Sequence, residues 1–158
     1  MSKKATNKTK KLMKDTTNDE ELLNSIDKAK LKDAIEYFCK YRNPEWVKSK
    51  VVGKTEDGKD ILSWPYVSYT EEAWYYIDLM EPDFDYIDNY KKYCENTLPT
   101  DMNVHQIRTM FTYIQQGERF CDGLFRRFIK DGTILKYLLR LDDLLSKLDI
   151  DSAVDKIQ

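Results

Sequence analysis

His105, the chain's single histidine, is the residue best suited to general acid–base catalysis, because its ordinary pKa lies near neutral pH. Helical spacing places it on one polar stripe with Arg108, Thr109 and Thr112. A general base also needs an orienting partner and a nucleophile within hydrogen-bond reach. The stripe predicts neither, so we interpret it as a solvated helix face.

The cysteines suggest no reactive or metal-bound thiol. Cys39, Cys94 and Cys121 are widely separated and include no Cys-x-x-Cys pair, which favours reduced thiols over a disulfide framework or a zinc knuckle. Arg119 could lower the pKa of nearby Cys121. Because Cys39 and Cys121 both fall on apolar helix faces, we expect Cys121 to be an inert, buried thiol.

Motifs for other chemistry are missing from the sequence. The acidic residues near Asp142 and Asp149 lack the alternating spacing and central glycine of a calcium loop. There is no phosphate-binding glycine loop, Gly-x-Ser-x-Gly elbow or His-Glu-x-x-His pair. We therefore predict no catalytic residue, metal or cofactor, although an enzyme of unrecognised type remains an alternative.

Length and composition favour one helical domain. The chain has 158 residues and a mass of 18.8 kDa. Hydrophobic residues make up 41% of it and aromatic residues 13%. Five glycines and four prolines supply few tight turns, which argues against a many-stranded sandwich or barrel. We predict a mainly α fold, a compact bundle of five to six helices with one short β-hairpin near residues 51–62.

Charge divides the chain into a basic start and an acidic remainder. Six lysines and no acid lie within the first fourteen residues, whereas the other residues hold 20 basic and 28 acidic side chains. We predict a disordered basic tail at 1–16, a single domain at 17–150 and a frayed C-terminus at 151–158. The chain has no apolar run typical of a signal peptide or a spanning helix, so we expect a cytoplasmic protein that does not bind membranes.

Periodicity predicts the elements within the domain. Helices are expected over 17–42, over 84–95, over 104–117 and over 120–130, and two more begin at Thr70 and at Thr133. The first bends at Asp27, and Gly117 ends the helix over 104–117. The apolar stripe of the last helix is wide enough to need two neighbours, within the domain or in a second copy, which permits a homodimer. That stripe comprises Ile134, Leu138, Leu141, Leu145 and Leu148.

Residues 112–123 read Thr-Tyr-Ile-Gln-Gln-Gly-Glu-Arg-Phe-Cys-Asp-Gly and are followed by Asp131-Gly132 and a leucine-rich end. This pattern resembles the C-terminal signature of DUF6508, a bacterial domain of unknown function, and residues 65–72 and 84–86 are similar to its earlier half. The resemblance covers about 62–142. It implies a bacterial or phage origin and no particular activity.

The core of that signature sits where one predicted helix ends and the next begins. Arg119 could hold the exposed carbonyls of the first helix, or bind a carboxylate or phosphate. Gly123 falls inside a predicted helix, which usually indicates close packing against another backbone. We interpret Glu118, Arg119, Phe120 and Gly123 as a structural motif.

Tyrosines carry the main functional hypothesis. Seven of them lie between positions 66 and 93, and exposed tyrosines anchor protein interfaces, whereas a tyrosine-rich core edge is the alternative. We predict a small protein-binding module, such as an accessory or inhibitor factor, with candidate contacts at Tyr66, Tyr69, Tyr75, Tyr76 and Tyr86. The alternative function is nucleic-acid binding by the lysine tail and an Arg126/Arg127 face, against the repulsion of the acidic remainder.

Overall fold

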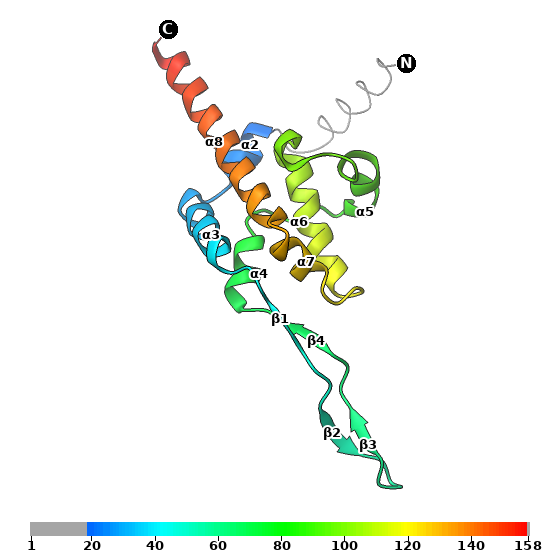
Figure 1. Cartoon of the computed structure of the whole chain (residues 1–158). Helices are drawn as coiled ribbons and strands as arrows, with labels where there is room; N and C mark the ends of the chain where they lie inside the picture. The colour runs from blue at the N-terminus through cyan, green and yellow to red at the C-terminus, as the bar shows by residue number, and fades with distance from the viewer. Residues whose placement is uncertain (1–18, 158) are drawn as a thin grey trace.

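Helices dominate the computed structural model, which describes residues 19–157 (Figure 1). A helical body carries a long β-hairpin arm that projects from one end, and this arrangement confirms the mainly α fold with a hairpin. The predicted basic tail at 1–16 lies outside the described residues. None of the helices within 19–157 is both long and apolar enough to cross a membrane.

The first two helices follow the predicted bend. Helix α2 (Asp19–Asn24) is separated from α3 (Lys28–Lys40) by Asp27, whose carboxylate accepts hydrogen bonds from the N–H groups of Ala29 and Lys30. A side-chain acceptor at this position satisfies donors that a helix start leaves unpaired. Helix α3 ends shortly before Pro44, as expected.

The arm is longer than the predicted hairpin. Strands β2 (Val51–Lys54) and β3 (Asp60–Leu62) form the predicted pair, with Gly58 at φ +83° in the turn. Strands β1 (Glu45–Val47) and β4 (Tyr66–Ser68) also pair antiparallel, nearer the body. We call residues 45–68 the arm, strands β1 and β4 its base, and residues 51–64 its tip.

The middle of the chain departs from the predicted helix over 84–95. After α4 (Glu71–Ile77) there is a short α5 (Tyr86–Asn89), a π-helical turn η1 (Tyr90–Cys94) and a 3₁₀ turn η2 (Pro99–Asp101). Phe84 and Ile87, expected to face inward, are exposed. The reason is Asp83, whose buried carboxylate accepts from the N–H of Asp85 and delays the helix start.

Helix α6 (Val104–Glu118) overturns the prediction of a solvated His105. That histidine is only 7% exposed, and its Nε2 lies 2.8 Å from the Asp19 carboxylate. Thr109 donates to the buried Asp83 carboxylate at 2.6 Å, and Thr112 accepts from the Asp83 N–H at 2.9 Å. Helix α2 and the segment around Asp83 therefore cover the polar stripe.

The passage from α6 to α7 (Leu124–Lys130) also differs from the prediction. Gly117 lies inside α6 rather than ending it, and α7 begins at Leu124, not at Phe120. Phe120 and Cys121 consequently lie on an exposed turn, and Cys39 is exposed as well. The expectation of buried thiols at Cys39 and Cys121 was wrong. Cys94 is buried, and this burial raises its pKa to about 12.

Helix α8 (Thr133–Ile157) runs through the body and supplies much of its core. Its leucine stripe packs against α2, α3, α6 and α7, so neighbours within the domain cover the stripe that had permitted a homodimer. Residues 151–157, predicted to fray, continue the helix and are exposed. The fully buried side chains of α8 are Ile134, Leu138 and Leu141.

Candidate functional site

The tip of the arm exposes a cluster of large apolar side chains to solvent. Strands β2 and β3 pair with each other, and all of their residues except the half-buried Gly53 are exposed. Apolar residues at neighbouring strand positions usually belong to a core, but the tip projects away from every labelled helix (Figure 1). Exposed apolar clusters of this kind mark interaction surfaces. The exposed apolar residues of the arm are Trp46, Val51, Val52, Ile61, Leu62, Trp64 and Tyr66.

Both faces of the tip are apolar. Val51 pairs with Leu62 across the strands, and adjacent residues of a strand point to opposite faces, so Ile61 lies on the other face. A two-stranded hairpin gains little stability in water by itself. Within one copy these apolar side chains remain exposed on both faces.

Glu118 fastens the base of the arm to the body. Its carboxylate accepts hydrogen bonds from the Tyr69 hydroxyl at 2.7 Å and from the N–H groups of Gly123 and Phe125, each at 2.9 Å. The Tyr69 hydroxyl in turn accepts from the Arg126 N–H. A carboxylate at the start of α7 satisfies the donors that the helix leaves open and complements its positive end.

Burial reinforces this network. The Tyr69 ring packs against Trp74 and Phe125, with ring centroids 5.3 and 4.9 Å away. Desolvation raises the pKa of the Tyr69 hydroxyl, and its hydrogen bond to Glu118 adds to the rise. Tyr69 therefore stays protonated and remains a donor to Glu118.

Gly123 and Arg126 add two further attachments. Gly123 adopts φ +92°, and a Cβ there would lie 2.7 Å from the Trp46 ring of strand β1, so only glycine admits this contact. The Arg126 guanidinium donates from Nε to the Pro44 carbonyl at 2.7 Å. Gly123 thus meets strand β1 at Trp46, and Arg126 bonds to Pro44 just before that strand. Glu118 bonds to Tyr69, the residue that follows β4.

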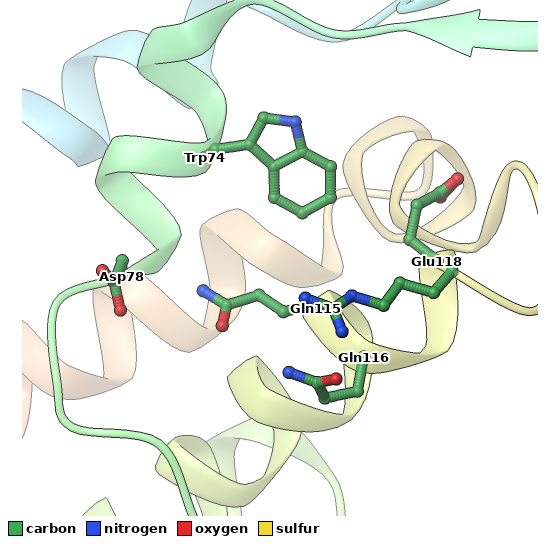
Figure 2. Close-up of a pocket in the computed structure, with 6 residues that line it drawn as sticks. Trp74, Asp78, Gln115, Gln116 and Glu118 are labelled. Carbon is green, nitrogen blue, oxygen red and sulfur yellow. The ribbon is translucent and has the colours of Figure 1, made fainter.

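A recess of about 440 Å³ opens beside this junction (Figure 2). Trp74 and Asp78 come from α4 and the turn after it, and Gln115 and Gln116 come from α6, while the Glu118 carboxylate turns toward the start of α7. Arg119 completes the lining. The lining offers donors and acceptors to a polar group, and its ionisable side chains are the Asp78 and Glu118 carboxylates and the Arg119 guanidinium.

Other candidate chemistry finds no support in the described part of the chain. Among residues 19–157 no group of three His, Cys, Asp or Glu side chains could hold a metal ion. The Arg126/Arg127 face offers less positive charge to a phosphate than expected, because the Arg126 guanidinium donates to the Pro44 carbonyl. Arg127 remains exposed beside the Phe128 ring.

The five candidate tyrosines divide between the two interpretations. Tyr66 is exposed on the arm, and Tyr75 is exposed on α4 with the Lys30 ammonium 3.8 Å from its ring centre. Tyr69, Tyr76 and Tyr86 are half-buried, and Tyr69 and Tyr76 pack against the core, as the core-edge interpretation requires. The structure does not gather the five into one patch.

Sequence reasoning missed the apolar tip. Val51, Val52, Ile61 and Leu62 were used only to predict a hairpin, and Trp64 only to close it. The available signal was that neither strand alternates apolar with polar residues, so neither has a polar face for water.

Comparison with curated proteins gave no match, and comparison with solved structures gave none either. The family model described as a family of unknown function, DUF6508, matches residues 23–147. This match includes the whole arm and the Glu118 junction, and extends beyond the part whose residues suggested it. The chain therefore belongs to the DUF6508 family.

Proposed function

We propose that this chain is a non-catalytic, cytoplasmic protein-binding module that acts through its arm, as an accessory or inhibitor factor in a bacterium or a phage. The observation that carries the proposal is the exposed apolar tip on an arm with its own attachment to the body. Leu62 and Trp64 are 61% and 87% exposed. Burial of large apolar side chains, aromatic ones above all, supplies most of the energy of protein interfaces.

The attachment at Glu118 supports this interpretation. A partner gains most from a surface that is already fixed in its binding geometry, because less conformational entropy is lost on binding. Tyr69, Glu118 and Gly123 fix the base of the arm, and the recess beside Trp74 offers polar contacts to a partner that reaches the base. Hot-spot residues rimmed by polar contacts are typical of protein interfaces.

Matched surface variants test this function. We compare affinity capture from the source cells by the tagged full chain, by the Leu62→Ser/Trp64→Ser variant and by the Phe84→Ser/Ile87→Ser variant. The second pair is also exposed, at 87% for Phe84 and 57% for Ile87. Phe84 lies just before α5 and Ile87 within it, and α5 belongs to the body (Figure 1). We expect the arm variant to lose a stoichiometric partner that the body variant retains. Equal capture by both variants would contradict the proposal.

Nucleic-acid binding remains a separate prediction that rests on the lysine tail and Arg127. Each phosphate contact adds to a salt-dependent affinity. Arg127→Glu tests the face without disturbing the Arg126 contact to Pro44. A gel shift that persists after both Arg127→Glu and deletion of residues 2–14 would exclude this mode of binding.

A further inference from the structure

The outer edge of strand β3 can be assigned from the hydrogen bonds of the tip. The Ser63 N–H donates to the Lys50 carbonyl at 2.8 Å, and the Thr55 N–H donates to the Lys59 carbonyl at 2.8 Å. Residues of an antiparallel strand alternate between bonding inward and bonding outward. Counting from either end, the backbone groups of Asp60 and Leu62 point outward, away from β2.

The two edges of the tip differ in how they are protected. On β2 the pairing is irregular between Val51 and Gly53, and such a bulge, together with flanking lysines, discourages the addition of another strand. On β3 the register is regular from Asp60 to Leu62. Strand β3 therefore presents the open edge of this hairpin.

We infer that this edge pairs with β3 of a second copy, so that two tips form one four-stranded antiparallel sheet. The register is self-complementary about Ile61. Asp60 of each copy lies opposite Leu62 of the other, and both are outward residues, so each pair can exchange N–H and carbonyl bonds. The two Ile61 side chains then lie directly opposite one another, at the distance of a close cross-strand pair.

Charge does not oppose a second copy at this place. Residues 45–66 hold four lysines and four acidic residues, so two arms do not repel each other. The excess of acid in residues 15–158 lies outside the arm, on bodies that the length of the arms keeps apart (Figure 1). Pairing also covers part of the apolar surface and adds strands to a hairpin that is marginal alone.

Two proline variants separate edge pairing from other contacts. Leu62→Pro removes an outward N–H without touching the bonds to β2, because proline is tolerated at outward positions of edge strands. Val51→Pro does the same at the opposite edge, and the two side chains are similarly exposed, at 61% and 55%. Unfolding curves of both variants check that the body remains folded.

Sedimentation equilibrium of the purified full chain measures the result. We expect the wild type and Val51→Pro to approach twice 18.8 kDa with rising concentration, and Leu62→Pro to dissociate about tenfold more easily or more. A wild type that stays at 18.8 kDa, or two variants that behave alike, would overturn the inference. This test does not depend on the proposed function. A monomeric wild type whose partner capture is lost in the Leu62→Ser/Trp64→Ser variant would overturn the pairing and leave that function standing.

Discussion

Replacing Glu118 with glutamine tests whether the family signature holds the arm on the body. The carboxylate accepts one hydrogen bond at 2.7 Å from Tyr69 and two at 2.9 Å from the N–H groups of Gly123 and Phe125. Glutamine keeps the shape of the side chain. Whichever way its amide turns, however, the NH₂ group faces at least one of these donors, which then loses its acceptor.

The expected cost follows from those contacts. A hydrogen bond to a charged group contributes about 1.5–3 kcal/mol, and a negative charge at a helix start adds about 0.3–1 kcal/mol. We expect Glu118→Gln to lower the free energy of unfolding by about 2–4 kcal/mol. Tyr69→Phe removes one donor to Glu118 and the acceptor of the Arg126 N–H, and should cost about 1–2 kcal/mol.

Urea unfolding, followed by far-UV circular dichroism, measures these changes. The control is Glu36→Gln, which removes an exposed charge from α3 and should change the free energy of unfolding by less than about 0.5 kcal/mol. Because Glu118 and Tyr69 are in contact, the double variant should lose less than the sum of the two single losses. A Glu118→Gln loss as small as that of the control, or strictly additive losses, would refute this role of Glu118.

Three further predictions concern other buried contacts of the body and the junction. Gly123→Ala should destabilise the protein more than Gly132→Ala in thermal unfolding. Both place alanine at a positive φ, which is strained, but only Gly123→Ala also drives a Cβ into an aromatic ring. Equal losses of stability would contradict this. Desolvation lowers the pKa of His105 below 6.5, so the stability that its neutral form contributes is complete above that pH and declines as the pH falls toward the folded-state pKa. His105→Gln should remove this part of the pH dependence of the unfolding free energy, and an unchanged slope would refute it. Thr109→Val should cost about 1–3 kcal/mol in urea unfolding, because it removes the hydroxyl that donates to the buried Asp83 carboxylate at 2.6 Å and leaves that carboxylate the donors of Asp85 and Asn89; a neutral result would show that this bond is dispensable.

Local chemistry explains which elements the sequence predicted well. Asp57-Gly58 supplies the positive φ that the hairpin turn needs, and Asp27 caps α3 from the adjacent position. Both signals act within a few residues. Pattern reasoning therefore found the hairpin and the bend before α3.

Contacts between distant residues explain the errors. The start of α7 depends on the left-handed Gly123 and on the Glu118 carboxylate, which Tyr69 holds from 49 positions earlier in the chain, so apolar periodicity alone did not place it at Leu124. His105 is buried because α2 brings Asp19 over it. Periodicity assigns residues to faces, but it does not say which faces another element will cover.

The candidate site was predicted in part. Glu118 bonds to Tyr69 and to the start of α7. Gly123, expected inside a helix against another backbone, instead precedes α7 at φ +92° and lies against the Trp46 ring. Arg119 lines the recess, and Phe120 is exposed. The apolar tip was missed because apolar residues in a strand usually indicate burial. Only the arrangement in space shows that nothing within the described body covers Trp64.

A photo-reactive benzoylphenylalanine at position 64 tests the protein-binding function most directly. The matched control carries the same group in place of Phe84, since Trp64 and Phe84 are both 87% exposed and only Trp64 belongs to the arm. After irradiation of the source cells, we expect a discrete covalent adduct between position 64 and a different protein, and none from position 84. No such adduct from position 64, or the same adduct from both positions, would contradict it.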